Sequence, residues 1–218
     1  GGADLVVIAT PVNTVKEVLD GLGEVLSGGE VLVTDVGSTK KEIVDYAAKY
    51  KDKFSFVGGH PLAGSEKAGV EYSNSDLFEK SLCVITPGEE SSKEHVEKLS
   101  AFWEALGAEV DIIAPELHDE VFSFTSHLPH IAAYALCGAV DEKFFKYAST
   151  GFKDTTRIAS SDAILWSDIF MSNKGNVLKS IEKYKKILGE IENAIKAGKI
   201  DKLKEELNSI KTKRDEIS

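Results

Sequence analysis

The sequence predicts an α/β fold in its first half and an all-helical fold in its second half. Up to about residue 114, short apolar runs typical of buried strands alternate with segments whose apolar residues recur at helical spacing. From Pro115 onward the strand pattern disappears and only helical patterns remain. Strands that alternate with helices form a parallel or mixed sheet, and ligands bind at the carboxyl ends of its strands. We therefore expect a sheet-containing domain over residues 1–114 and a helical domain over residues 115–218.

The first half contains five candidate strands and three candidate helices. The first helix follows the first strand directly and should stop at a pair of glycines. Capping boxes should open the second helix, through Thr39 and Glu42, and the third helix, through Ser91 and Glu94. The strands are expected at residues 5–9, 31–36, 54–57, 82–85 and 110–113.

The second half should consist of helices of two kinds. The segment from Val121 to Val140 is apolar on more than one face, which favours a helix buried centrally or between subunits. Pro129 lies inside this segment and should kink the helix and free a carbonyl. Between Ile164 and Ile217, apolar residues at helical spacing with Lys and Glu between them predict one or two amphipathic helices, interrupted near Gly198.

The composition excludes several classes of partner. A formal net charge of −10 argues against nucleic acid and against an anionic membrane surface, because both require a basic face. Cys83 and Cys137 stand far apart among apolar neighbours, as reduced thiols of a cytoplasmic protein do. No apolar run approaches the length of a membrane span. A small anionic substrate would therefore need cations gathered at one place.

The most informative segment is the glycine-rich stretch Gly58–Glu66. It follows a short apolar strand and should place His60 in a loop at the end of this strand. Pro61 should make the backbone directly after His60 rigid, because proline fixes φ. Glycines lack the Cβ atoms that would keep a ligand away from the backbone. Histidine accepts protons near neutral pH, so His60 is a candidate general base. The alternative is that His60 only caps a turn.

The ends of the first two strands carry candidate cofactor contacts. Thr10 and Pro11 end the first strand, and Gly37 and Ser38 follow the second strand just ahead of a helix. In an α/β sheet, both are positions at which a cofactor or an anionic group is held.

Two imidazoles lie three residues apart in the segment Ser126–His130. His127 and His130 flank a proline and could share one helix face. A metal site is not expected, because a zinc site needs further ligands and no third one is evident. Buried hydrogen-bonded histidines, or polar groups that line a substrate cleft, are the preferred interpretations.

A cationic segment follows, from Lys153 to Arg157, in a Gly/Thr-rich stretch. The guanidinium of Arg157 offers two parallel hydrogen bonds to a carboxylate, which favours a carboxylate substrate. A surface ion pair between Arg157 and Asp154 fits the spacing equally well.

Taken together and in this order, the motifs resemble those of the prephenate dehydrogenase family over essentially the whole chain. The resemblance implies a Rossmann-type nucleotide-binding domain followed by an all-α domain that forms a homodimer. It also implies the oxidative decarboxylation of prephenate to 4-hydroxyphenylpyruvate with NAD in tyrosine biosynthesis; some members use NADP and some prefer arogenate. The motifs are Ala9–Pro11, Asp35–Lys40, Gly59–Glu66, Ser126–His130 and Phe152–Ala159.

The resemblance also implies roles for single residues. His60 matches the catalytic histidine that takes the proton of the ring hydroxyl, and Ser38 matches a serine that positions this hydroxyl and the nicotinamide. Arg157 matches the arginine that binds a substrate carboxylate, and one of His127 and His130, which we cannot distinguish, faces the substrate. Further cofactor contacts are expected from Thr10, Pro11, Val36 and Gly37, and further cleft residues are Ser65, Glu66, Lys153, Asp154 and Trp166.

One part of the family's pattern is not found. The Gly-x-Gly-x-x-Gly loop and the strand before it are absent from the sequence, so we expect the first half of the nucleotide-binding domain to be missing from this chain. Two other functions stay open. One is a different NAD-dependent dehydrogenase with a helical carboxyl-terminal domain, such as a hydroxyacid dehydrogenase with a catalytic lysine at Lys153. The other is a dimerising fragment without catalysis.

Overall fold

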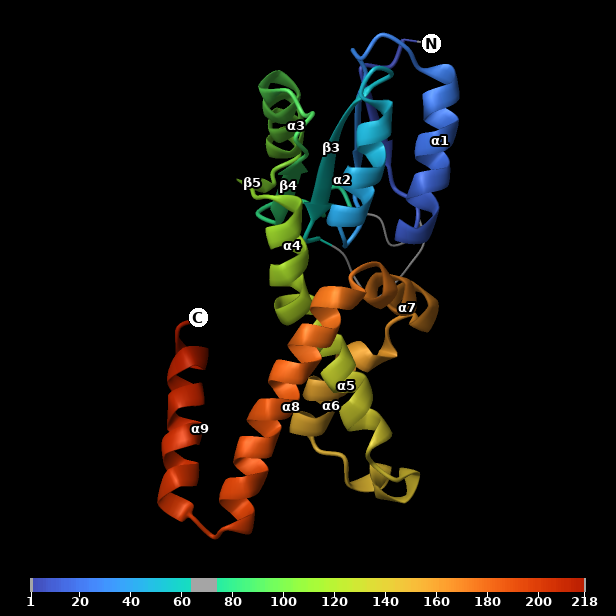
Figure 1. Ribbon diagram of the computed structural model, residues 1–218. Coiled ribbons are helices and arrows are strands. Elements are labelled where there is room, and N and C mark those ends of the chain that lie inside the picture. The colour runs from blue at the N-terminus through green and yellow to red at the C-terminus, as the bar shows by residue number, and fades with distance from the viewer. Residues whose placement is uncertain (1, 64–73, 218) are drawn as a thin grey trace. The chain divides into compact units, whose positions relative to one another are not determined.

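The computed structural model describes residues 2–63 and 74–217. This part of the chain divides into two compact units, residues 1–176 and residues 177–218. The first unit carries the sheet, the helices that cover it and most of the following helices. The second unit carries the larger part of one long helix and the last helix (Figure 1).

The sheet of the first unit has the strand order β1-β2-β3-β4-β5 within the described residues. Strands β1, β2 and β3 are parallel, β4 runs antiparallel to β3, and β5 is parallel to β4. The expected mixed sheet is therefore confirmed. Because β1 to β3 share one direction, their carboxyl ends meet at one edge of the sheet. The strands are β1 (Leu5–Ile8), β2 (Leu32–Asp35), β3 (Ser55–Pro61), β4 (Leu82–Pro87) and β5 (Glu109–Ile112).

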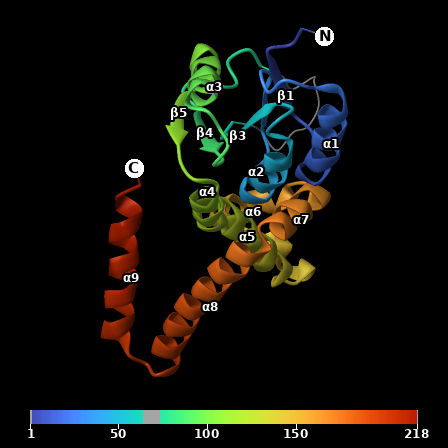
Figure 2. The same ribbon diagram turned by 45° about the horizontal axis from the view of Figure 1, so that its top comes forward.

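Helices cover both faces of the sheet. Successive side chains of β2 point to opposite faces, so Val33 packs with α1 and α2 while Leu32 packs with α3. Figure 2 shows α1 and α2 on one side of the strands and α3 on the other. The elements are η1 (Val12–Thr14), α1 (Val15–Val25), α2 (Lys41–Ala47), η2 (Ala48–Tyr50) and α3 (Lys93–Ala105).

Only helices follow β5 in the part of the chain that the structure describes. We keep the domain boundary near residue 115 as a proposal, supported by this change from strands to helices. Of the one or two amphipathic helices expected between Ile164 and Ile217, the interruption near Gly198 is confirmed, and Gly198 has the positive φ of +63° that favours glycine. The same range also contains α7, which ends before Asn173, and this further break was not expected. The elements are α4 (Pro115–Phe122), η4 (Ser123–His127), α5 (Leu128–Gly138), η5 (Glu142–Tyr147), α6 (Thr150–Thr156), η6 (Arg157–Ser160), α7 (Ala163–Ser172), α8 (Lys174–Lys196) and α9 (Ile200–Asp215).

The expected continuous helix from Val121 to Val140 is wrong in detail. A π-helical turn, η4, separates α4 from α5, and Pro129 lies in the first turn of α5, where a missing N–H is tolerated. The expectation of a centrally buried helix is not met within this chain either, because α5 buries only Ala133.

Both expected capping boxes are wrong. Thr39 does not cap α2, because its hydroxyl lies 3.0 Å from the hydroxyl of Ser172. The N-cap residue of α2 is Lys40, and its side chain forms no capping hydrogen bond. The N-cap of α3 is Ser92, whose hydroxyl accepts from the His95 N–H at 3.2 Å. Ser91 instead accepts from Gly88 N and donates to the carbonyl of Phe56. In both cases a partner distant in sequence replaces the local one.

His60 lies within β3 rather than in a loop, because β3 extends to Pro61 and pairs His60 with Val84 of β4. The two preceding glycines have a different purpose from the one expected. A Cβ on Gly58 would lie 2.4 Å from Thr86 Oγ1, and one on Gly59 would lie 2.9 Å from the carbonyl of Asp35. These glycines thus let neighbouring strands and side chains of the protein itself approach, and this packing fixes the position of His60.

Candidate functional site

A cavity of about 610 Å³ opens at the carboxyl edge of the sheet. The ends of β1, β2 and β3 form one wall and α3 forms another. Ser38 and His60, which lie 22 positions apart in the sequence, both line this cavity, and Val36 lies with them. The lining is otherwise mostly apolar: Val7, Ala9, Pro61, Leu62, Ala63, Leu77, Phe78, Phe102, Trp103 and Leu106.

His60 is the first member of a chain of three buried polar side chains. Its Nδ1 lies 2.8 Å from His118 Nε2, and His118 Nδ1 lies 2.8 Å from Asp119 Oδ1. The ring of Phe122 packs against both imidazoles, with its centroid 4.8 Å from that of His60 and 4.4 Å from that of His118. The sequence analysis missed His118 and Asp119, although a His-Asp pair in the first helix after the strands was a signal that could have found them.

The environment keeps these histidines neutral. Burial lowers the pKa of His60 well below its ordinary value, and the neighbouring His118, Lys40 and His127 lower it further. Burial also lowers the pKa of His118, although the contact with Asp119 opposes this shift. A neutral imidazole has one nitrogen free to accept a proton. His60 is therefore ready to act as a base at neutral pH.

Asp119 is anchored by the start of α2. Its carboxylate accepts the backbone N–H of Lys40 at 2.8 Å and of Lys41 at 3.0 Å, and its backbone carbonyl accepts from the Asn173 amide at 2.7 Å. A negative charge at a helix N-terminus is stabilised by the N–H groups that point at it. Asp119 of α4 therefore supplies the cap of α2 that Thr39 was expected to provide, and α4 is held against the sheet domain.

A fully buried ion pair links the ends of β2 and β3 near the cavity. The ammonium of Lys40 pairs with the carboxylate of Asp35 and donates to the carbonyl of Gly59 at 2.8 Å. Asp35 also accepts the N–H of Gly37 at 2.9 Å. Burial lowers the pKa of Lys40 and the pair with Asp35 opposes this. The pair ties the end of β2, which leads to Ser38, to the residue before His60.

A second group of rings lies among the helices of the first unit. The imidazole of His130 stacks on the indole of Trp166 with centroids 3.3 Å apart, while His127 meets the same indole edge-on at 6.3 Å. His127 is fully buried; its Nδ1 lies 3.3 Å from the Asn173 amide and its Nε2 has no partner. Burial lowers the pKa of His130, and the charge of Arg157, an exposed side chain, lowers it further. The positive charge of Arg157 therefore acts on the imidazole that stacks on Trp166.

The remaining predicted residues are placed as follows. Thr10 and Pro11 are exposed after β1, and Gly37 lies beside the cavity-lining Val36 and Ser38. Lys153 and Asp154 are exposed on α6, one turn before Arg157. Ser65 and Glu66 lie outside the described residues.

The buried histidines predict a loss of stability in acid. Burial lowers the pKa of His127 to about 4, whereas an unfolded histidine titrates near 6.5. Between these values the unfolded state binds more protons than the folded state, so stability falls as the pH falls from about 6.5 to about 4 and is fully present above that window. His127 alone should contribute about 3 kcal/mol. Urea denaturation across this pH range measures the slope.

The control for this prediction is His127→Gln, whose side chain does not titrate. The variant should show a shallower rise of stability with pH than the parent chain. An unchanged slope would show that His127 takes up its proton in the folded state and that the burial argument is wrong.

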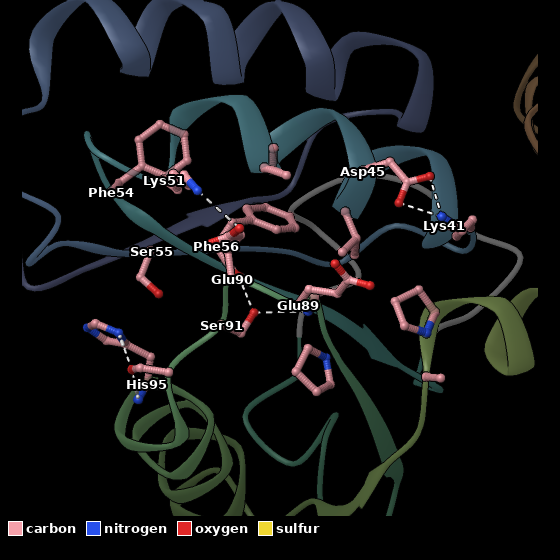
Figure 3. A pocket seen from close by; sticks show the side chains of 18 of the residues that line it. Lys41, Asp45, Lys51, Phe54, Ser55, Phe56, Glu89, Glu90, Ser91 and His95 are labelled. Carbon is pink, nitrogen blue, oxygen red and sulfur yellow. Dashed lines mark hydrogen bonds and ion pairs between the residues drawn. The ribbon is translucent and has the colours of Figure 1, made fainter.

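A second cavity, of about 600 Å³, lies at the opposite end of β3. Figure 3 shows two ion pairs among its charged side chains, Lys41 with Asp45 and Lys51 with Glu90, the latter at 3.1 Å. None of the site residues expected from the sequence lines it. We therefore assign no function to this cavity.

The described residues offer neither a metal site nor a membrane-spanning helix. Within residues 2–63 and 74–217, no group of three or more His, Cys, Asp or Glu side chains is arranged to hold a metal ion. In the same ranges, no helix is both long enough and apolar enough to cross a membrane.

The fold and the cavity define the chain as a nucleotide-binding α/β domain with helices after it. Residues 2–112 match the family model described as "Prephenate dehydrogenase, nucleotide-binding domain", and residues 114–209 match the model described as "Prephenate dehydrogenase, dimerization domain". The chain therefore belongs to the prephenate dehydrogenase family, which confirms the resemblance seen in its motifs. The expectation of a missing first segment stays a prediction.

Individual relatives agree with this. The chain is 36% identical to the prephenate dehydrogenase of Bacillus subtilis over 220 residues, covering 98% of this chain and 59% of that protein. It is 37% identical to the enzyme of Lactococcus lactis over 207 residues, covering 91% of this chain and 56% of that protein. The chain thus spans less than two thirds of the length of these curated relatives.

Solved structures show the same fold. A prephenate dehydrogenase of A. aeolicus, in complex with hydroxyphenyl propionate and NAD+, is 42% identical with a TM-score of 0.91, covering 99% of this chain and 77% of that one. An arogenate dehydrogenase of Synechocystis is 28% identical with a TM-score of 0.87, covering 99% of this chain and 80% of that one.

Proposed function

We propose that this chain acts as a prephenate dehydrogenase of tyrosine biosynthesis, which converts prephenate to 4-hydroxyphenylpyruvate with NAD as the hydride acceptor. The observation that carries the proposal is the position of His60: a neutral, buried base at the carboxyl edge of the sheet, in the same cavity as Ser38. The relatives named as prephenate dehydrogenases support the substrate.

The chemistry assigned to His60 is a proton transfer. Its imidazole accepts the proton of the substrate's ring hydroxyl as a hydride leaves the ring carbon that bears this hydroxyl and passes to NAD. The bond to the ring carboxylate then breaks, carbon dioxide leaves, and the electron pair of that bond makes the ring aromatic. The proton held by His60 returns to the oxygen, which becomes a phenol. Ser38, on the same cavity wall, donates or accepts a hydrogen bond that orients this hydroxyl.

The cavity fits a nicotinamide and a small ring. Its volume of about 610 Å³ and its mostly apolar lining are those of a small-molecule site, and Trp103 Nε1 is a buried donor without a protein partner. When bound, NAD would supply the hydride acceptor. Val36, Gly37 and Ser38 after β2, with Thr10 and Pro11 after β1, are the residues of this chain proposed to hold it. The A. aeolicus relative was solved with NAD+, which favours NAD over NADP.

Arg157 is proposed to bind a carboxylate of the substrate. Its guanidinium lies near the stacked His130 and Trp166. Of the two histidines, His130 is the better candidate for the substrate side, because it is half-buried and experiences the charge of Arg157, whereas His127 is wholly buried. Lys153, Asp154, Ser65 and Glu66 complete the proposed cleft.

Two further properties belong to the proposal. A homodimer is supported by the match of residues 114–209 to a dimerization domain. A cytoplasmic location is supported by Cys83 and Cys137, neither of which forms a disulfide.

The test is turnover of prephenate at neutral pH by a purified, intact-length version of the protein. With NAD and prephenate as substrates, NADH, measured by its absorbance, and 4-hydroxyphenylpyruvate should form in equal amounts. The variant His60→Asn serves as the matched negative control. Parallel reactions with arogenate and with NADP decide the substrate and the cofactor. Failure of all four combinations would contradict the proposal and favour the non-catalytic alternative, and turnover of hydroxyacids alone would favour the other dehydrogenase class.

A further inference from the structure

The chain His60–His118–Asp119 does more than bury three polar groups, because it determines which nitrogen of His60 carries a hydrogen. Asp119 accepts two backbone N–H groups and so acts as a carboxylate acceptor, and Oδ1 can only accept from His118 Nδ1. His118 therefore carries its hydrogen on Nδ1. A neutral His118 then has a lone pair on Nε2.

This lone pair faces His60 Nδ1 at 2.8 Å. Two acceptors cannot bond to each other, so His60 Nδ1 must be the donor of this hydrogen bond. In a neutral His60 the other nitrogen, Nε2, is then the one with a free lone pair. Because Nδ1 is engaged with His118, Nε2 is the atom that remains for a ligand in the cavity that His60 lines.

We propose that His118 is a positioning residue that holds His60 in the Nδ1–H tautomer, and that Asp119 fixes His118 in turn through its anchorage on the start of α2. The tautomer part rests on these contacts and on the neutral state of the buried His118, whereas its effect on turnover rests on the function proposed above.

The surroundings of the chain reinforce this arrangement. The charged or titratable groups that face His60 are His118 on α4, Lys40 before α2 and His127 in η4. Those that face His118 are Asp119, Lys40 and Asp35. Lys40 is held by Asp35, and Phe122 covers both imidazole rings. Asp119 is therefore the negative group in direct contact with the histidine pair, and it does not line the cavity.

Two substitutions separate positioning from mere packing. In His118→Gln, the amide oxygen can accept from His60 and the amide nitrogen can donate to Asp119, so the order of donors and acceptors is kept. In His118→Phe, the ring fills the space but offers neither group. The matched control is His95→Gln, a substitution of a half-buried histidine in the first turn of α3 that does not line the cavity of His60.

The first readout is independent of activity. Nitrogen NMR of histidine-labelled protein distinguishes protonated from unprotonated ring nitrogens, and the His60 signals are assigned by their loss in His60→Asn. His60 should be protonated on Nδ1 in the parent chain, in His118→Gln and in His95→Gln. In His118→Phe the hydrogen should move to Nε2 in a measurable fraction of molecules.

The second readout is turnover of prephenate. His118→Phe should lower kcat by about 10- to 100-fold with little change in KM, which is the usual cost of losing a partner that orients a functional histidine. His118→Gln should retain most of the parent's kcat. Circular dichroism and thermal melts show whether each variant is folded. If His118→Phe is unfolded, the comparison of His118→Gln with the parent chain decides the question.

Three outcomes would overturn the proposal. They are an Nε2–H tautomer of His60 in the parent chain, an unchanged tautomer in folded His118→Phe, and a folded His118→Gln that loses the Nδ1–H tautomer. A parent chain that shows the Nδ1–H tautomer but turns over neither prephenate nor arogenate would support the positioning role and would count against the proposed function alone.

Discussion

Replacing His60 by asparagine is expected to lower kcat by about two to four orders of magnitude, the range for a positioned general base. KM for prephenate should change little, because the base acts on the proton in the transition state and does little to hold the substrate. Asparagine can keep a hydrogen bond to His118 but has no nitrogen that accepts a proton. Steady-state kinetics with prephenate and saturating NAD measure both constants.

The matched control is His95→Asn, which changes a half-buried histidine in the first turn of α3 that does not line the cavity of His60. It should leave both constants as in the parent. A His60→Asn variant with near-normal kcat at neutral pH would remove His60 from the proton transfer, and the alternative that His60 only stabilises the end of β3 would then be preferred.

The fold could be predicted from the sequence where the pattern is local. Short apolar runs predicted the strands to within a few residues, and the helical spacing after Pro115 predicted the all-helical character of the second half. The breaks between individual helices, such as η4 between α4 and α5, were not predicted. The helix caps could not be predicted in this way. Asp119 caps α2 by accepting the N–H of Lys40, which lies 79 residues earlier in the sequence. Ser91 likewise donates to the distant carbonyl of Phe56. These hydrogen-bond partners are brought together only by the tertiary fold.

The candidate site could be predicted only in part, for the same reason. His60 and Ser38 follow from a general rule, because the carboxyl ends of parallel strands meet at one edge of the sheet. The roles of Arg157 and Trp166 came from the family resemblance, and they remain proposals. His118, Asp119 and Lys40 were missed. His118 and Asp119 matter through contacts with residues 58 or more positions away in the sequence. Lys40 matters because it is buried in an ion pair, whereas a lysine in a sequence is normally taken to be exposed to solvent.

Replacing Arg157 by alanine should act mainly on binding. A charge-assisted, bidentate contact to a carboxylate is worth about 1.5 to 3 kcal/mol, so KM for prephenate should rise by about 10- to 150-fold. Arg157 is the first residue of η6, directly after α6. Its charge acts on His130, which stacks on Trp166, and Arg157 is not among the groups that shift the pKa of the proton acceptor His60. The effect on kcat should therefore be smaller than that of His60→Asn.

Two variants test whether the loss is specific to the guanidinium at this position. Arg214→Ala removes the other arginine of the chain, on α9, and should leave KM unchanged. Arg157→Lys keeps the charge but not the planar pair of donors, so its KM should fall between those of the parent and of Arg157→Ala. If saturation by prephenate is the same in Arg157→Ala as in the parent, the guanidinium does not bind the substrate carboxylate, and the surface ion pair with Asp154 becomes the better interpretation of this segment.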